Sequence, residues 1–293
     1  MLKDLAVVGI KGLSIRSDIF LETLRYAKTK GVKVINMSFG MELEPSIPYF
    51  SDVDETKEGF WIALADWDDK KLGLAVNLFR KELDDPTLSF STLKDMLDMI
   101  RSKLKSNYAK MIQGANEIKT QENDILIVTA AGNDHSHLET MPLMVPQNFY
   151  ALGNVIVVAA ATQDGHLSPY SNWHPERVHV AAIADELVML EPQNKQTKRI
   201  TTGGTSAATA QVSKLAGVIY HLFSQHGFDI QKIKPILVKT LILRTAAPKD
   251  RLKGKVQTGG LIDPKRAIET VEKIIQRFPP TKELRVEDIE SFF

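Results

Sequence analysis

The residues with the clearest chemical potential lie at positions 201–210, which read Thr-Thr-Gly-Gly-Thr-Ser-Ala-Ala-Thr-Ala and run into an apolar stretch with helical spacing. This pattern places Ser206 in the first turn of a helix, at the positive end of the helix dipole, with its hydroxyl clear of the chain. A serine in that position could serve as a nucleophile. A simpler alternative is that Thr205 or Ser206 only caps the helix.

Asn133 is the second candidate, because it follows a predicted buried strand at 125–128 and the small residues 130–132. Ligands of parallel α/β sheets bind at the carboxyl ends of the strands. A side-chain amide there could donate a hydrogen bond to a developing oxyanion, and small neighbours would let a substrate backbone approach. The alternative is that Asn133 merely tolerates a left-handed turn after Gly132.

The elements that would position these two residues predict an α/β fold. Short apolar runs are typical of strands buried on both faces of a parallel sheet, and Ser17 or Asp18 can cap a helix that Gly31 ends. Strand, helix and strand in succession predict a right-handed βαβ unit. The predicted strands are 5–10, 32–37, 125–128, 155–161 and 179–183, and the further helices are 206–220, 234–245 and 265–275.

Three segments depart from this alternation. Residues 41–122 are predicted to be a helical insertion, with one long amphipathic helix at 93–118 and shorter helices before it, whose aromatic residues we interpret as packing. Residues 184–200 are expected to be irregular. Residues 276–293 are expected to form a peripheral C-terminal tail.

Composition excludes several classes of function. The 293 residues can bury a sizeable core, and 43% hydrophobic and 25% charged residues are ordinary for a soluble globular protein. The formal charge of +1 favours neither a nucleic-acid nor a membrane partner. With no cysteine, disulfides, thiolate metal sites and cysteine nucleophiles are excluded. No signal peptide or membrane-spanning run is present, so the cytoplasm is the default compartment.

Several segments together resemble the subtilisin-like serine peptidases (subtilases). Gly-Thr-Ser-Ala-Ala-Thr at 204–209 resembles the Gly-Thr-Ser-x-Ala-[Ser/Thr] nucleophile segment of that family. Residues 128–133 resemble its Ala-Ala-Gly-Asn motif, and residues 34–40 resemble its Val-Ile-Asn-Met-Ser-[Leu/Phe]-Gly strand. Residues 168–172 and 260–263 are also similar.

The resemblance covers most of residues 1–40 and 123–275. It implies a three-layer α/β fold with a mostly parallel sheet, and a partial peptidase domain over 1–275 that is incomplete at its N-terminal side. It implies that Ser206 is the nucleophile and Asn133 the oxyanion donor. The residues implied to line the substrate cleft are Ser38, Phe39, Gly40, Ala130, Ala131 and Gly132.

The family also places an Asp in an Asp-[Ser/Thr]-Gly strand end and a His in a His-Gly-Thr helix start, both upstream of the segment that residues 5–10 resemble. None of the seven histidines is followed by Gly-Thr. His135 and His137 could replace the missing base, but a solvated loop explains them better. We therefore expect a fragment of such a domain, with the remaining part encoded separately or upstream. Without it, Val212, Leu215, Val218 and Ile219 are expected to face a groove.

These observations favour a serine endopeptidase acting on protein or peptide substrates, nearly inactive without the missing base. The alternative is a peptidase fold that has lost catalysis and binds extended peptides by β-augmentation. An unrelated α/β hydrolase is disfavoured, because no Gly-x-Ser-x-Gly elbow surrounds Ser206. No cofactor is expected. A structural calcium ion is compatible with the fold but has no identifiable ligands. Neither a nucleic-acid nor a membrane partner is expected.

Overall fold

The computed structural model describes residues 17–39, 41–42, 91, 95, 113–114, 116–138, 144–185, 187–193 and 196–293. The strand predicted at 5–10 and most of the predicted insertion at 41–122 lie outside the described residues. Within that insertion, residues 91, 95, 113–114 and 116–120 are helical, in agreement with the predicted long helix. Its first two residues instead form the strand β2 (Met41–Glu42), which pairs antiparallel with β4 (Met144–Val145).

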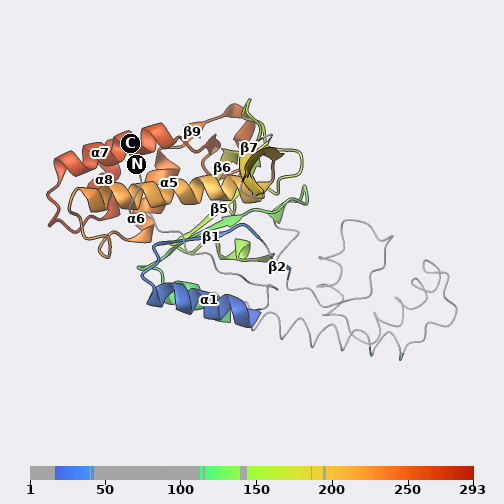
Figure 1. The fold of residues 1–293 in the computed structure, drawn as a ribbon, viewed down its shortest axis with the longest axis horizontal. Coiled ribbons are helices and arrows are strands. Elements are labelled where there is room, and N and C mark those ends of the chain that lie inside the picture. Colours follow the sequence, from blue (N-terminus) through green and yellow to red (C-terminus); the bar gives the residue numbers. More distant parts are fainter. Residues whose placement is uncertain are drawn as a thin grey trace.

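A six-stranded sheet forms the centre of the fold, in the order β1–β3–β5–β6–β10–β9 (Figure 1). All neighbouring pairs are parallel except β10 with β9. The strands are β1 (Val34–Met37), β3 (Leu126–Ala130), β5 (Val155–Ala161), β6 (Val180–Ile183), β9 (Ala247–Pro248) and β10 (Gly260–Leu261). The mostly parallel sheet expected from the sequence is present.

Helices cover both faces of this sheet, so the fold has three layers (Figure 1). Successive residues of β5 alternate between the two cores: Ile156 and Val158 pack on one face, and Val155 and Val157 on the other. This is the alternation that strand geometry requires. One face is covered by α1 (Ser17–Thr29), and the other by α5 (Thr205–Gln225), α6 (Pro235–Arg244) and α7 (Pro264–Arg277).

The sequence-based prediction of an irregular segment at 184–200 is wrong. Strands β7 (Leu187–Gln193) and β8 (Gln196–Thr202) form an antiparallel hairpin with seven paired positions. Pro192 lies inside β7, where a proline normally argues against a strand. A two-stranded hairpin tolerates it, because each strand has one edge without a partner.

The prediction of a peripheral tail at 276–293 is also wrong. Leu284 and Ile289, which lies in the short helix α8 (Val286–Ile289), are buried in the core cluster formed by α5, α6 and α7. Phe278 and Phe292 face each other nearby, with 6.4 Å between the ring centroids. The segment therefore completes the core on this face.

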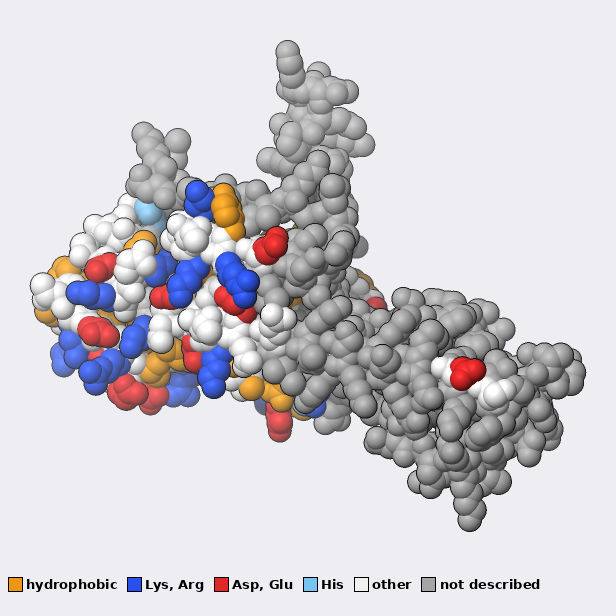
Figure 2. Space-filling model, turned by 90° about the horizontal axis from the view of Figure 1, so that it is seen from below, with side chains coloured by type: hydrophobic (Ala, Val, Ile, Leu, Met, Phe, Trp, Pro, Cys, Tyr) orange, Lys and Arg blue, Asp and Glu red, His pale blue; other side chains and the backbone are white. Residues whose placement is uncertain are grey.

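The expected groove along α5 is not found either. Val212, Leu215 and Ile219 are buried, with exposed fractions of 0%, 4% and 0%, and Val218 is half-buried. No helix in the described part of the chain is both long and apolar enough to cross a membrane. Figure 2 shows basic and acidic side chains interspersed over the described surface on one face, in keeping with the small net charge.

Candidate active site

Ser206 lies in the first turn of α5, directly after the turn that follows β8. The residue at the N-cap is Gly204, whose φ of 97° favours glycine, and no side chain caps the helix. The alternative in which Thr205 or Ser206 caps the helix is therefore wrong. The hydroxyl of half-buried Ser206 instead donates a hydrogen bond to the carbonyl oxygen of Ser38, with 2.9 Å between the two oxygens.

Asn133 lies beside the same turn. Its Oδ1 accepts hydrogen bonds from the backbone N–H of Thr205 at 2.9 Å and from the Thr205 hydroxyl at 3.0 Å. A Cβ on Gly204 would lie 3.6 Å from the Nδ2 of Asn133, so this amide nitrogen lies against the start of α5. The positive φ angles of the loop belong to Gly132 and His135, which makes the left-handed alternative for Asn133 wrong.

The residues expected to line a substrate cleft come from two neighbouring strands. Ser38 and Phe39 follow β1, while Ala130 ends β3 and residues 131–132 follow it. Because β1 and β3 pair in parallel, these two segments end at the same edge of the sheet. Gly40 lies outside the described residues. The structure thus brings the described members of the predicted set together next to Ser206.

Gln147 contributes to this arrangement and was missed by the sequence analysis. Its side chain is fully buried, and its Nε2 donates to the carbonyl oxygen of Phe39 at 3.2 Å and to that of Ala130. Gln147 therefore ties the ends of β1 and β3 together. No local pattern distinguishes this glutamine, because its partners lie 108 and 17 positions away.

Asn172 holds the loop that carries Asn133. Its Oδ1 accepts from the backbone N–H groups of Asp134 and Ser136, both at 2.9 Å, and its Nδ2 donates to the carbonyl oxygen of Ala131 at 3.1 Å. The side chain is fully buried. Asn172 belongs to a segment that the sequence analysis singled out, but its bridging role was not recognised.

All seven histidines lie in the described residues, and none of them is a hydrogen-bond partner of Ser206. The ring of His135 contacts the carbonyl oxygen of Pro169. The ring of His137 packs edge-on against that of Trp173, with 4.5 Å between the centroids. The described residues also contain no cluster of three or more His, Asp or Glu side chains able to hold a metal ion.

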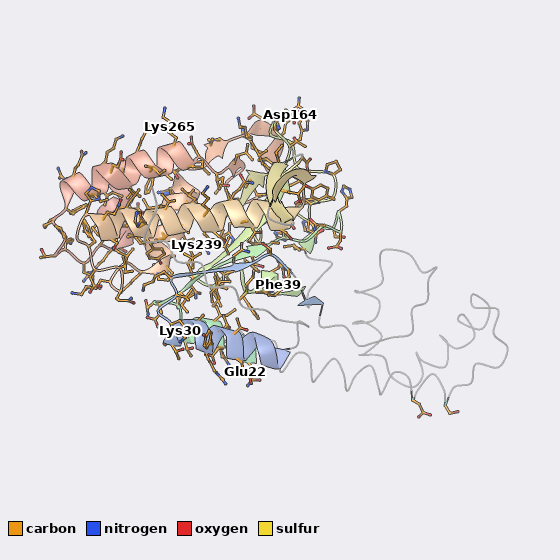
Figure 3. All side chains as sticks on the ribbon, viewed as in Figure 1. Glu22, Lys30, Phe39, Asp164, Lys239 and Lys265 are labelled. Atoms are coloured by element: carbon orange, nitrogen blue, oxygen red, sulfur yellow. The ribbon has the colours of Figure 1, made fainter. Side chains whose placement is uncertain are left out.

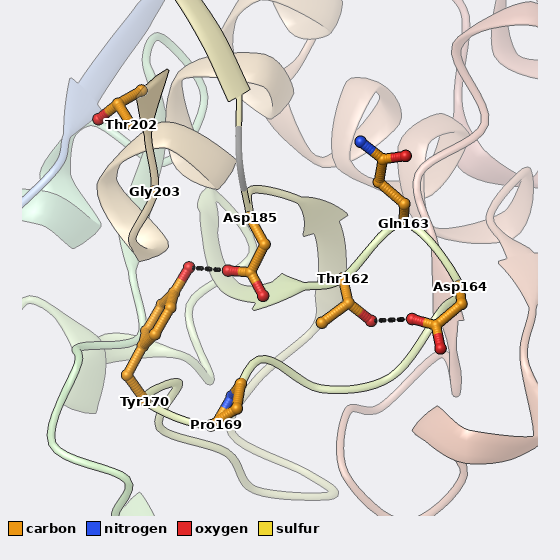
Figure 4. Close-up of a pocket in the computed structure, with 8 residues that line it drawn as sticks. All are labelled: Thr162, Gln163, Asp164, Pro169, Tyr170, Asp185, Thr202 and Gly203. Atoms are coloured by element: carbon orange, nitrogen blue, oxygen red, sulfur yellow. Dashed lines mark hydrogen bonds between the residues drawn. The ribbon is translucent and has the colours of Figure 1, made fainter. Parts of the chain in front are cut away.

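A pocket of about 740 Å³ opens beside the turn that precedes Ser206 (Figure 4). It is lined by residues 162–164, Pro169, Tyr170, Asp185 and residues 202–203. The Tyr170 hydroxyl donates to Oδ1 of Asp185 and accepts from the backbone N–H of Gly204 at 2.8 Å. Burial, reinforced by the hydrogen bond to Asp185, raises the pKa of Tyr170, so its hydroxyl stays protonated near neutral pH.

The chain is similar to known proteins in sequence and in fold. The sequence model of the subtilase family matches residues 4–266. Among curated proteins, Subtilisin-like protease 3 of Plasmodium falciparum (isolate 3D7) is 25% identical over 173 residues, which covers 54% of this chain and 21% of that protein. The chain therefore spans about a fifth of the length of this curated relative.

Two solved structures share the fold. A lanthipeptide protease aligns with a TM-score of 0.55 at 16% identity, over 87% of this chain and 66% of its own. The prenylagaramide maturation protease PagA aligns with a TM-score of 0.51 at 20% identity, over 90% and 70%. With a family match over 263 consecutive positions and a fold shared with subtilisin-like proteases, the chain belongs to the subtilase family of serine peptidases.

Proposed function

We propose that this chain carries the nucleophile and the oxyanion site of a serine endopeptidase, and that Ser206 is acylated by the peptide substrate. The observation that supports this most strongly is the shared anchoring of the two candidates. Ser206 lies in the first turn of α5, and its neighbour Thr205 orients Asn133 through two hydrogen bonds to Oδ1. The Nδ2 of Asn133 has no acceptor among the described residues. It is therefore available to donate a hydrogen bond to the carbonyl oxygen of the scissile bond.

In the proposed reaction, the Oγ of Ser206 attacks the scissile carbonyl carbon while its proton passes to a base. The carbonyl oxygen becomes an oxyanion that accepts a hydrogen bond from the Nδ2 of Asn133. Collapse of the tetrahedral adduct expels the amine, which takes up the proton, and leaves an ester on Ser206. Water then hydrolyses this ester. Ser38 and Phe39 on one side and residues 130–132 on the other would pair with the backbone of the substrate.

The base is the component that the described histidines do not provide. We propose that it comes from an Asp–His pair encoded outside the 293 residues, because no histidine here is followed by Gly-Thr or contacts Ser206. Losing the histidine of such a triad costs about 10⁶-fold in turnover, a value known from subtilisin itself. The isolated chain should therefore be nearly inactive.

The hydrogen bond from Ser206 to Ser38 also favours a second candidate function, an inactive peptidase fold that binds extended peptides. With its hydroxyl donated to a backbone carbonyl and no histidine beside it, Ser206 is not activated in this structure. The ends of β1 and β3 could still pair with a peptide backbone.

The two functions are separated by a proteolysis assay. The chain is mixed with the polypeptide encoded directly upstream of Met1, and cleavage of casein is followed with and without Ser206→Ala. The endopeptidase proposal predicts cleavage that needs both polypeptides and is abolished by the substitution. Peptide binding without any Ser206-dependent cleavage would instead support the binding protein.

A further inference from the structure

The pocket beside the active-site turn has the size and the polarity to receive a substrate side chain. Its volume of about 740 Å³ is within the usual range for ligand sites. Hydroxyl, amide and carboxyl groups line it, and Pro169 adds an apolar wall. Figure 4 shows the hydroxyl of Tyr170 joined to the carboxyl of Asp185 by a hydrogen bond in the lining of this pocket.

The two carboxylates of the pocket differ in their partners. Asp164 accepts a hydrogen bond from Thr162 and lies 3.2 Å from the Nε2 of His166, and these contacts, with Arg251 further out, lower the pKa of its carboxyl.

Asp185 is half-buried, and among the described residues it accepts a hydrogen bond only from the neutral hydroxyl of Tyr170. No lysine, arginine or histidine in the described part of the chain pairs with it. Asp185 is therefore a carboxyl group in a pocket without a cationic partner among the described residues, so its charge is available to a cationic group that enters from outside.

The turn before Ser206 relates this pocket to the scissile bond. Successive residues of the turn contact successive segments at the edge of the sheet. A Cβ on Gly203 would lie 3.2 Å from the carbonyl oxygen of Ala184, just before Asp185. Gly204 donates to Tyr170, Thr205 contacts Asn133, and Ser206 contacts Ser38.

The cleft segments after β1 and β3 and the pocket after β5 and β6 thus follow one another along this edge of the sheet, beside the same turn. In the view of Figure 3, Phe39 and Asp164 lie well apart, below and above the start of α5. A peptide whose acyl part pairs with the ends of β1 and β3 would direct its leaving part, the residues after the scissile bond, toward Asp185.

We propose that this pocket binds a positively charged side chain, lysine or arginine, from the leaving part of the peptide, and that Asp185 is its ion-pair partner. This inference rests on the proposed function, because it takes the occupant to be a peptide that passes Ser206. Tyr170 positions the carboxylate and, through Gly204, connects it with the start of α5.

The test measures binding, so it does not depend on the missing base. The full chain carrying Ser206→Ala is titrated against fluorescein-labelled nonapeptides of alanine and serine that contain one lysine at each position in turn. Matched peptides carry norleucine, which keeps the aliphatic stem and removes the charge. Two further variants add Asp185→Asn, which preserves an acceptor for Tyr170, or Asp164→Asn, which changes the net charge equally but at the carboxylate that already has partners.

We expect lysine to improve affinity about three- to tenfold over norleucine at one or two adjacent positions, less so at high salt. Asp185→Asn should abolish this advantage, and Asp164→Asn should leave most of it. Equal affinities for lysine and norleucine at every position, an advantage that survives Asp185→Asn, or no peptide binding at all would overturn the inference. Lysine-dependent binding without Ser206-dependent cleavage would contradict the proposed function but not this inference. Ser206-dependent cleavage without a preference for lysine would contradict this inference but not the proposed function.

Discussion

The hydroxyl of Ser206 donates to the carbonyl oxygen of Ser38 at 2.9 Å, and the hydroxyl of Ser38 donates to the carbonyl oxygen of Ser206 at 3.0 Å, although the two serines are 168 positions apart. This reciprocal pair ties the end of β1 to the first turn of α5. It therefore holds one wall of the candidate cleft against the candidate nucleophile. For Ser206 to attack a carbonyl, its hydroxyl must leave Ser38, so a base has to compete with this backbone acceptor.

Replacing Ser38 by alanine should lower the free energy of unfolding by about 1 kcal/mol, because the carbonyl oxygen of Ser206 loses a donor. Urea denaturation monitored by circular dichroism measures this change. Ser224→Ala is the matched control, since Ser224 is exposed near the end of the same helix. Equal stabilities of the two variants would show that the reciprocal pair contributes nothing to the fold.

Asn133→Asp separates the chemical role of the amide from its structural role. The aspartate keeps an oxygen for the N–H and hydroxyl of Thr205, and its charge near the start of α5 is favourable by a few tenths of a kcal/mol to about 1 kcal/mol. It replaces the Nδ2 donor with an acceptor, so acylation of Ser206 should slow about 10²–10³-fold. The rate of peptide cleavage in the reconstituted enzyme and the urea midpoint measure the two effects. An unchanged rate would mean that Asn133 is not the oxyanion donor.

Gln147→Met should destabilise the protein by about 1–3 kcal/mol, because the buried carbonyl oxygen of Ala130 and the partly buried one of Phe39 lose their shared donor. Peptide affinity should fall as well, since the ends of β1 and β3 would no longer be held together. Thermal unfolding and peptide titration provide the readouts. Gln276→Met, at an exposed position outside the pocket, is the control. Wild-type stability in Gln147→Met would contradict the cross-linking role.

Lys239 predicts a dependence of stability on pH. Burial lowers its pKa to about 8, only partly opposed by Glu122, while its Nζ donates to the carbonyl oxygen of Leu152 at 3.1 Å. Because the pKa in the folded state lies below that in the unfolded state, the unfolded chain binds the proton more tightly. The contribution of Lys239 to stability is therefore lowest below its folded pKa and rises with pH until its unfolded pKa is passed.

Lys239→Met removes this dependence. Between about pH 7 and about pH 10, the unfolding free energy of the wild type should rise by about 2 kcal/mol relative to that of the variant. The reason is that the buried amine of the wild type loses its charge over this range, whereas the variant has no such amine. Urea titrations at both pH values measure the difference. Lys232→Met, at an exposed lysine, corrects for the change in net charge. A difference between Lys239→Met and wild type that stays constant with pH would contradict a buried, titrating amine.

Much of the fold could be predicted because local patterns report burial and helix ends. The strand at 155–161 has the predicted limits, and α1 ends before Gly31, whose φ is 65°. Asp263, in the segment predicted to lead into the last helix, accepts from the N–H of Arg266 and caps α7. The hairpin of β7 and β8 was missed because its stability depends on pairing across the turn, which Pro192 obscures.

In the candidate site, too, residues within local motifs could be predicted, whereas residues that act through long-range contacts could not. Ser206 and Asn133 were found from their motifs, whereas Gln147 and Asn172 were not assigned their roles. The contacts of these two buried amides join segments 17 to 108 positions apart. Neither the periodicity nor the composition of one segment encodes which carbonyl a distant amide will reach.

The role of Ser206 as the acylated residue can be tested by covalent labelling. The chain, mixed with the polypeptide encoded directly upstream of Met1, is treated with a fluorophosphonate that phosphonylates activated serines, digested and analysed by mass spectrometry. We expect label on Ser206 that depends on the upstream polypeptide and is absent in Ser206→Ala. Label on another serine in a mixture that cleaves protein, or proteolysis that survives Ser206→Ala, would contradict this role.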